Sequence, residues 1–447
     1  MKRIILSVLL ILCFSVVASH AEEFGEVDIH GFIAQGFMQS DENKFFANTK
    51  KGTFEFNEMG INFSTDLTND LRVGMQFFAR DLGEFGNDEI AVDWVFADYH
   101  YKPWLGIRMG KMKVPFGLYN ETRDVDMLRT TILLPQGVYN EGWRDTISSI
   151  KGSGLYGAVP LGPVGGFIYN IQTGIMDIPT EGGIGKFAQD QGDQTANVID
   201  PETAFIGSLL WETPLEGLRI GVTISKVDFD IASSTNDGPL WRYRSIVAAM
   251  GGSTTAADAA IAGAGGSIDA VYGAGVQGSA ADLVGLNLDF PIELLWSVYS
   301  VEYVWNNLTI AGEYSMNNAD YNLAIAGTST MLVQDTELKI EGYYGSVSYR
   351  FTDLFELGLY YSEFYPDADD KDGLTLPELG YPKEAGWSKD ICLSTRFDLN
   401  ESWVIKVEGH LMDGLAVMFM SDQDRIGTGY DVDEDWFLGA VKFSYSF

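Results

Sequence analysis

Residues 403–411 read WVIKVEGHL, and this stretch decides the fold. The odd positions carry apolar residues or glycine, whereas Lys406, Glu408 and His410 stand at even positions. Side chains of a β-strand alternate between two faces, so this pattern predicts a strand with one apolar face and one charged face. The same alternation recurs along the chain, for example over 70–81 and 216–230, and helical periodicity is nowhere comparable.

The connections between these segments alternate between tight turns and long stretches. Long structureless loops are uncommon in compact soluble domains, but an up-and-down membrane barrel has short turns at one rim and long loops at the other. The sequence therefore predicts an all-β fold, a 16-stranded antiparallel up-and-down transmembrane β-barrel with short periplasmic turns and long extracellular loops. The expected strands are 26–39, 53–66, 70–81, 91–102, 104–113, 151–160, 163–173, 202–213, 216–230, 293–305, 307–319, 338–351, 354–366, 387–398, 402–413 and 435–447. The expected long connections include 114–150, 174–201, 231–292, 367–386 and 414–434.

The cost of burying charge in lipid decides which face of the strands is outside. A basic side chain at the bilayer midplane costs about 2–4 kcal/mol, so Lys406 and similar residues must point into the barrel. A soluble barrel would turn the apolar face inward instead. A tilted spanning strand needs about 9–11 residues, which most segments supply. Six tryptophans at strand ends are expected to form an interfacial aromatic belt: Trp104, Trp211, Trp305, Trp387, Trp403 and Trp436.

The two ends of the chain predict export to the outer membrane. Lys2 and Arg3 precede an apolar stretch over 4–18 and then small residues, which is typical of a secretory signal peptide, assigned to 1–21. The barrel domain is then 22–447. Cys13 lies in the signal peptide, so the barrel domain keeps one cysteine, which cannot form an internal disulfide. The chain ends on Phe447 after alternating apolar residues, which resembles the C-terminal assembly signal of bacterial outer-membrane barrels.

Charge and motifs exclude several functions. The 447 residues carry 29 basic and 63 acidic side chains, a net charge of −34, so nucleic acid is not an expected partner. No GxSxG stretch accompanies His30, His100 or His410, and no glycine-rich phosphate loop occurs. The aspartates at 367–372 and 431–435 are expected to be a solvated acidic surface rather than a calcium site. We therefore expect no enzyme activity, no cofactor and no metal.

One segment reverses the sign of the charge. Residues 102–151 hold eight basic and five acidic side chains, a net of +3, while the rest of the chain carries −37. The segment includes the long connection 114–150, in which Glu121 to Leu134 could form a short helix with Met127, Leu128 and Leu134 packing. Because a barrel of about sixteen strands is wide enough for an aqueous lumen, this connection is a candidate for narrowing it.

A resemblance to a known family supports the same assignment. Residues 110–119, GKMKVPFGLY, are similar to the junction between a strand and the third loop in porins related to the phosphate-selective porin O/P group. The resemblance implies a constriction loop at 114–150 that folds into the barrel, and a homotrimer. It implies Lys111, Lys113, Arg123, Arg129 and Arg144 as the positive lining, to which inward parity adds Arg72, Arg80 and Arg108.

Three alternatives stay open at this point. Lys111 and Lys113 share the parity of the lipid-facing residues, so either they lie at the rim or a bulge near Gly110 resets the alternation. The basic residues either form an anion-attracting constriction or pair with Glu121, Asp124 and Asp126. The Ala- and Gly-rich stretch 248–281 is either a flexible external loop or a pair of short helices over the pore mouth.

The leading functional prediction is an outer-membrane porin that lets small hydrophilic solutes and ions diffuse passively through a water-filled barrel. Its expected partners are these solutes, outer-membrane lipid and copies of itself. The alternative is a structural barrel that sheathes a partner such as an electron-transfer cytochrome. A hydrolase stands third, because it would need a base such as His410 beside a nucleophile.

Overall fold

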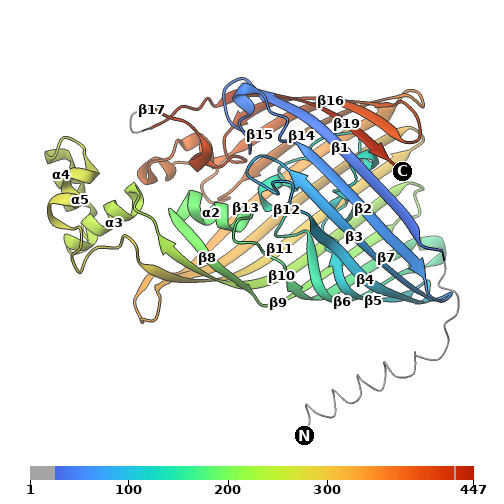
Figure 1. Ribbon diagram of the computed structural model, residues 1–447, viewed down its shortest axis with the longest axis horizontal. Coiled ribbons are helices and arrows are strands. Elements are labelled where there is room, and N and C mark those ends of the chain that lie inside the picture. Colours follow the sequence, from blue (N-terminus) through green and yellow to red (C-terminus); the bar gives the residue numbers. More distant parts are fainter. Residues whose placement is uncertain (1–25, 427–428) are drawn as a thin grey trace, which may run out of the picture.

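The computed structural model describes residues 26–426 and 429–447 and forms one closed barrel (Figure 1). The predicted signal peptide lies outside the described residues. Seventeen strands form a single antiparallel sheet that closes where β1 pairs with β19. β8 and β9 both pair with β10 and are separated by Glu202 alone, so together they form one strand of the wall. The wall therefore has sixteen strands, which confirms the predicted fold.

The bounds of the strands are as follows. The first half comprises β1 (Asp28–Ser40), β2 (Asn57–Asp66), β3 (Leu71–Asp81), β4 (Ala91–Lys102), β5 (Leu105–Lys113), β6 (Ser149–Pro160), β7 (Gly166–Met176), β8 (Gln194–Pro201) and β9 (Thr203–Glu212). The second half comprises β10 (Leu218–Thr235), β11 (Asn287–Trp305), β12 (Leu308–Ile325), β13 (Met331–Arg350), β14 (Phe355–Tyr365), β15 (Ser388–Asp398), β16 (Trp403–Gly414) and β19 (Asp435–Ser446). β17 (Arg425–Ile426) and β18 (Gly429–Tyr430) form a separate two-stranded pair.

The two rims differ as the sequence predicts. Seven connections of two to five residues, from 67–70 to 399–402, lie at what we call the short-turn rim, together with the described N-terminal end and the C-terminus (Figure 1). The opposite, long-loop rim carries connections such as 41–56, 114–148 and 236–286. The link 326–330 is a short one at this rim, because β12 and β13 continue well beyond their predicted ends.

The alternation of the strands separates a lipid-facing surface from the lumen. In β16, Trp403, Val407 and Leu411 are exposed on the outside, whereas Lys406, Glu408 and His410 are buried inside the barrel. The apolar parity therefore faces outward, as predicted. Phe443 and Phe447 at the end of the chain share that outer face, and both are about half exposed, at 50% and 54%.

Four neighbouring strands, β10 to β13, extend past this apolar belt, and their polarity inverts. On β10, Ile220 and Ile224 point outward below the change, while Lys226, Asp228 and Asp230 point outward above it. The inward residues change in the opposite sense, from Thr223 to Phe229. Charged outer side chains are unfavourable in lipid, so these extensions stand above the hydrocarbon as a taller piece of wall, which we call the collar. The inversion explains why the sequence pattern ended these strands too early.

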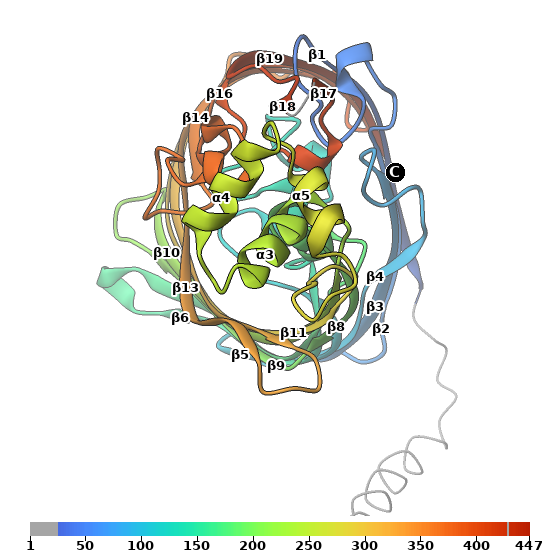
Figure 2. The ribbon, with the colours of Figure 1, turned by 90° about the vertical axis from the view of Figure 1, so that its left-hand side faces the viewer.

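The long-loop mouth is covered by three helices, α3 (Pro239–Ala249), α4 (Thr254–Gly263) and α5 (Ile268–Gly275), seen in front of the lumen in Figure 2. Each begins at an ordinary helix start: Pro239 is the first residue of α3, and Ser253 and Ser267 accept hydrogen bonds from backbone amides of α4 and α5. Residues 248–281 are thus largely helical. Among the residues described, none of the helices has the length and apolar character needed to cross a membrane.

One member of the expected tryptophan belt does not belong to it. Trp104, Trp305 and Trp403 are exposed on the outer surface, at 51%, 59% and 44%. Trp436 is only 3% exposed, because it lies on the inward parity of β19 beside Leu438. Its indole donates a hydrogen bond to the carbonyl of Gly414 at 3.1 Å. The prediction for Trp436 was wrong because it considered only that the residue lies near a strand end and not which face of the strand it occupies.

Candidate constriction loop

The connection 114–148 folds into the barrel and closes on itself at its base. The amide of Asn120 donates to the carbonyl of Val114 at 3.0 Å and to that of Ile147 at 2.8 Å, so the outgoing and returning stems touch. Residues 132–142 of the loop are all buried. They pack against inward side chains of distant strands, which makes the loop part of the interior of the barrel.

The expected short helix over 121–134 is absent, and the chain instead forms two 3-10 turns, at Asn120–Thr122 and Asp126–Leu128. Leu134 is buried as expected, but Leu128 is 64% exposed. The loop cannot continue as a helix because its carbonyl groups and amides bond to the barrel wall instead of to each other. The carbonyl of Thr131 accepts from Lys406, and the amide of Leu133 donates to Glu408.

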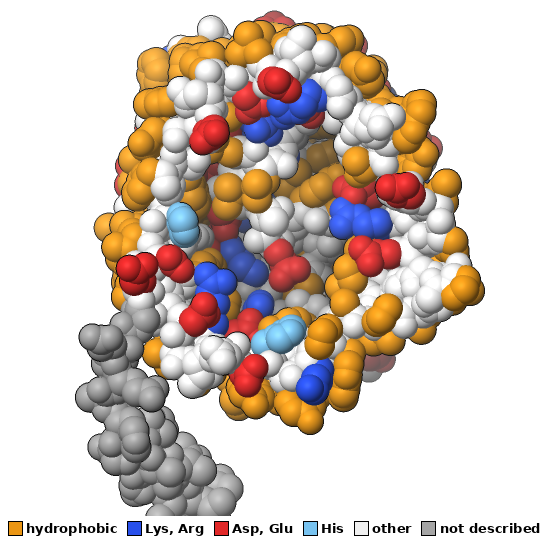
Figure 3. Space-filling model, turned by 90° about the vertical axis from the view of Figure 1, so that its right-hand side faces the viewer, with side chains coloured by type: hydrophobic (Ala, Val, Ile, Leu, Met, Phe, Trp, Pro, Cys, Tyr) orange, Lys and Arg blue, Asp and Glu red, His pale blue; other side chains and the backbone are white. Residues whose placement is uncertain are grey.

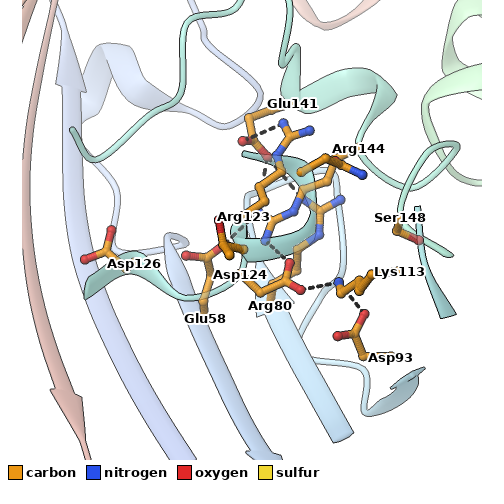
Figure 4. A network of polar contacts seen from close by, with 12 residues as sticks. Glu58, Arg80, Asp93, Lys113, Arg123, Asp124, Asp126, Glu141, Arg144 and Ser148 are labelled. Atoms are coloured by element: carbon orange, nitrogen blue, oxygen red, sulfur yellow. Dashed lines mark hydrogen bonds and ion pairs between the residues drawn. The ribbon is translucent and has the colours of Figure 1, made fainter. Parts of the chain in front are cut away.

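A continuous network of ion pairs joins the loop to the wall (Figure 4). Arg144 lies at its centre, with contacts of 2.6 Å to Glu58, 2.7 Å to Asp124 and 3.3 Å to Glu141. The basic members are Arg80, Lys113, Arg123, Arg129, Arg144, Lys406 and Lys442, and the acidic members are Glu58, Asp93, Asp124, Asp126, Glu141 and Asp145. Seven cations and six anions nearly balance one another.

The network contains most of the basic residues that the sequence proposed as pore lining. Arg80, Lys113, Arg123, Arg129 and Arg144 all belong to it, and their side chains are between 2% and 13% exposed. The structure thus brings these five residues together, each against a carboxylate. Glu121, in contrast, is an exposed side chain of the loop.

The remaining three proposed residues lie elsewhere. Lys111 contacts the carbonyl of Val92 at 2.6 Å and Asp177 at the long-loop rim. Arg108 points into the barrel nearer the short-turn rim, where it donates to Asp98 at 2.8 Å. Arg72, also inward, is exposed and donates to the hydroxyl of Ser64 at 2.7 Å.

The bulge that we expected at Gly110 lies on the neighbouring strand. β5 pairs with β4 and β6 without a shift through Gly110, whereas the pairing of β3 with β4 shifts between Gln76 and Phe77. The extra residue is Asp93, which accepts a hydrogen bond from Gln76 and pairs with Lys113 at 2.6 Å. Lys113 thus reaches the interior because its partner strand bulges and because it is the last residue of its own strand.

Asp126 reduces the electrostatic repulsion between two lysines of the barrel wall. Lys406 on β16 stands directly opposite Lys442 on β19, and like charges in that position destabilise a sheet. Both lysines are at most 1% exposed. The carboxylate of Asp126 enters from the loop, with its Oδ1 3.1 Å from Lys406 and 3.7 Å from Lys442. Its other oxygen accepts from the hydroxyl of Ser444 at 2.6 Å.

A second anchor is formed by Glu313 of β12. Its carboxylate accepts hydrogen bonds from the amide of Leu118 at 2.9 Å, from Tyr139 at 2.5 Å and from Tyr344 at 2.8 Å. Gly117 has a positive φ of 58°, and a Cβ there would come 2.7 Å from Glu313. Gly117, the second glycine of the 110–119 motif, is therefore required by the close approach of the loop to the wall.

The third anchor lies on β15 and β16. Glu408 accepts from the loop amides of Ile132 at 2.6 Å and Leu133 at 2.9 Å. His410 lies between two carboxylates, with Nε2 2.9 Å from Glu408 and Nδ1 3.0 Å from Asp390. Donor atoms of Cys392, Glu408 and His410 lie within 4.8 Å of one another, a spacing that could hold a metal ion. Both ring nitrogens of His410 already face carboxylates. We therefore interpret this cluster as part of the anchor that holds the loop and not as a metal site.

Cations hold the carboxylates of Asp126 and Glu141 in their charged form. Burial alone would raise the pKa of Asp126, but Lys406, Lys442 and Arg129 outweigh it and lower that pKa below its usual range. Burial and cations oppose each other in the same way at Glu141, where Arg123, Arg144 and Arg80 hold the pKa low. A lowered pKa means that the contribution of these groups to stability is complete above their ordinary pKa of about 4 and is lost as pH falls below it.

We therefore expect the loop to stay in place between pH 7 and about pH 5 and to loosen only below pH 4. Single-channel recordings over a pH series should show constant conductance and constant current noise across the upper range, with fluctuations appearing at the acidic end. A change of conductance between pH 7 and pH 5 would show that other groups hold the loop.

The short-turn half of the lumen is lined by arginines and acids in pairs. Figure 3 looks into this end and shows a hollow with basic and acidic side chains side by side. The inward arginines there are Arg72, Arg108, Arg219, Arg350 and Arg396. Arg350 contacts both Glu356 and Asp398 at 2.7 Å, and Arg219 pairs with Glu302. Arg72 differs, because it donates to the neutral hydroxyl of Ser64.

Sequence reasoning missed the acidic residues that the barrel wall contributes to the site. Glu58, Asp93, Glu313 and Glu408 stand at inward positions in the middle or upper part of their strands, where they hold the loop. The available signal was a carboxylate on the inward parity of a spanning strand, since an unpaired buried charge is costly and requires a partner. Parity alone cannot show which loop supplies that partner.

Comparisons with known proteins identify the fold. No protein-family model matches the sequence, and no curated protein matches it. The structure is similar to OmpT of Vibrio cholerae, an outer membrane protein, with a TM-score of 0.53 and 10% identity over 96% of this chain and 99% of that chain. It is also similar to OmpF of Salmonella typhi, solved in complex with daunomycin, with a TM-score of 0.50 and 13% identity over 95% of this chain and 98% of that chain.

The fold is that of a bacterial outer-membrane porin. A solved form of Vibrio cholerae OmpT is a trimer, with a TM-score of 0.51, 10% identity and coverage of 95% of this chain and 100% of that chain. At this identity the likeness concerns the fold alone, so the function of this porin-like barrel must be argued from its own residues.

Proposed function

We propose that this protein is an outer-membrane porin through which small hydrophilic solutes and ions diffuse passively. The observation that supports this proposal most is the combination of an apolar outer belt with a lumen that is lined by charged side chains and into which the loop 114–148 folds. A lumen of this kind admits solutes by size, and its charges weight ions by sign. No bond-making chemistry is required of the residues described.

The charge preference of the channel should be weak. The anion-attracting constriction that the sequence suggested stays a prediction, but it has less support, because Lys113, Arg123 and Arg144 each face a carboxylate at close range. A paired cation attracts a passing anion less than a free one does, since the field of its partner cancels much of its own. Arg72, with its neutral partner, is the best-placed residue to act on anions.

Reconstitution into planar bilayers tests the function directly. The full-length protein should give stepwise, ohmic currents, and the reversal potential across a salt gradient should be close to zero. Absence of any conductance from protein that is correctly folded and inserted would contradict the proposal.

Replacing Arg72 with Gln should move the reversal potential toward that of a cation-preferring channel, because it removes an exposed positive charge from the lumen. Ionic strength should reduce the effect, since salt screens exposed charges over about 10 Å at 0.1 M. The matched control is Lys151→Gln, which removes a 56% exposed charge that pairs with Asp177 at the rim. Equal shifts from both variants would show that Arg72 has no special access to the ion path.

The sheathing alternative has less support. A partner threaded through the barrel would have to displace the loop, whose amides and carbonyls are bonded to β12, β14, β15 and β16. Purification of the native protein without a stoichiometric red partner would favour the channel. The trimeric state and the relation to the phosphate-selective O/P group are further parts of our proposal, supported by the motif at 110–119 and by the trimer form of a structural neighbour.

A further inference from the structure

The inside of the collar is apolar, which is unusual for a wall that surrounds water. Phe229 and Ile231 of β10 point inward there, as do Leu288 of β11 and Leu323 of β12, and all four are at most 4% exposed. Outward neighbours of these residues include Asp228 and Asp230 on β10 and Asp289 on β11. Apolar side chains on the inner face of an aqueous vestibule are favourable only when something covers them.

Part of this apolar surface is covered by the chain itself, and part of it borders a cavity of about 320 Å³. The walls of the cavity come from the collar strands, from α2 (Gly183–Gly192) and from the loop residue Trp143. The apolar side chains that matter most here are Phe187, Phe290, Ile292, Leu338 and Ile340, each of which is partly accessible. A volume near 300 Å³ is at the lower end of small-molecule sites, so the occupant must be small.

One cation faces this cavity without an acidic partner. Arg244 of α3 lines the cavity, with its guanidinium 4.7 Å from the ring of Trp241. Across the part of the chain that the structure describes, no carboxylate lies within 4.0 Å of its nitrogens. Arg242, two residues earlier on the same helix, is different, because it contacts Asp237 and Asp269 at 2.7 Å each.

Two acidic residues border the cavity, Asp367 and Asp370, and three of their four carboxylate oxygens accept hydrogen bonds. Both carboxylate oxygens of Asp370 accept hydrogen bonds, from the amides of Leu374 and Thr375 at 2.8 Å each. Asp367 accepts from the amide of Asp369 at 2.9 Å. These oxygens are therefore turned to their own loop, whereas the donors of Arg244 remain available to a ligand.

We propose that this cavity binds a small amphipathic organic anion. The apolar body of the ligand lies against Phe290 and Ile292, and its carboxylate pairs with Arg244. An arginine in a partly desolvated site recognises a carboxylate through two parallel hydrogen bonds, which neither an amide nor an amine reproduces. The site lies in the vestibule above the constriction loop, so it would hold such a solute at the entrance of the barrel.

Binding to the full-length protein in detergent tests the proposal without any need for conduction. Isothermal titration with 4-phenylbutyrate, 4-phenylbutanamide and 4-phenylbutylamine varies the charge on a constant apolar body. We expect the carboxylate to bind about tenfold more tightly than the amide, which corresponds to about 1.4 kcal/mol, and the amine to bind more weakly than both. Acetate, which has the charge without the body, should show no measurable binding.

Variants distinguish the contribution of the Arg244 cation to binding from that of the apolar wall. Arg244→Gln should remove the preference for the carboxylate, a loss of about tenfold, and leave the affinity for the amide unchanged. Arg242→Gln, which removes the paired arginine of the same helix, should bind like the wild type. Phe290→Ala should weaken binding of the carboxylate and the amide alike. Heat-modifiable mobility of each variant on gels checks that its barrel is intact.

Tighter binding of the amine, equal binding of all three probes, or equal losses from Arg244→Gln and Arg242→Gln would overturn the assignment. No binding of 4-phenylbutyrate to correctly folded wild-type protein would overturn it as well. None of these results bears on whether the barrel conducts ions.

Discussion

Excision of residues 121–146 should raise the single-channel conductance several-fold. The structure makes this deletion feasible, because the side chain of Asn120 already touches the carbonyl of Ile147 at 2.8 Å, and a short Gly-Ser linker can join the two. Without the loop, water fills the middle of the lumen, and wall residues such as Arg80, Glu58 and Lys442 become hydrated rather than buried. Hydration replaces the lost ion pairs, so the barrel itself should persist.

The measurement compares current steps in planar bilayers for the excised and wild-type proteins under the same salt. Heat-modifiable gel mobility and the circular dichroism of the sheet should be unchanged, which shows that the barrel is intact. Unchanged conductance from an intact barrel would mean that the path of ions is limited elsewhere, for example under the helices α3 to α5.

Replacement of Asp126 by Asn should have the second-largest effect. The substitution keeps the shape of the side chain but removes the carboxylate that lies 3.1 Å from Lys406, whereas the opposing Lys442 keeps Glu58 at 2.5 Å. Loss of one partner from a buried ion pair costs about 3–5 kcal/mol. We expect the loop to detach or fluctuate, which should appear as a lower unfolding temperature in detergent and as added noise in the open-channel current.

The matched control is Asp145→Asn, an identical change in the same loop. Asp145 pairs with Arg80 at 2.6 Å but is 29% exposed, and Arg80 keeps a second partner in Glu141. This variant should therefore lose about 1 kcal/mol or less. Similar behaviour of the two variants would indicate that the repulsion between the two lysines is relieved by some other group.

The wall of the barrel was readable from the sequence wherever lipid imposes a rule. Lys406 cannot face lipid, because a charged side chain in the bilayer core is energetically unfavourable. This cost alone determines which face of β16 points into the barrel. The rule that charged side chains point inward applies only within the hydrocarbon region. Above the belt, Lys226 and Asp228 point outward into water and Phe229 points inward, so the expected pattern breaks at that point although the strand continues. β8 was missed for a related reason, because Gln194–Pro201 combines Pro201 with polar residues that local pattern assigns to loops.

The sequence drew attention to the segment whose basic residues the structure brings together, but it showed only part of their arrangement. The charge reversal over 102–151 pointed to the loop 114–148, and the alternative in which its basic residues pair with Asp124 and Asp126 describes the contacts that the structure shows. Glu58, Glu313 and Glu408 could not be foreseen as partners. They are far from the loop in sequence, and which of them meets it depends on where the closed barrel places each strand.

The contacts of Asp126 also have a consequence for assembly. Its partners Lys442 and Ser444 belong to the last strand, more than 300 positions along the chain, and that strand is the one that closes the cylinder by pairing with the first. The loop precedes most of the strands in the chain, but its binding site in the wall is incomplete until β19 is in place. Docking of the loop should therefore be a late and slow step of biogenesis, since contacts of such long sequence separation form slowly, and the newly closed cylinder should pass through a transiently wide-open stage.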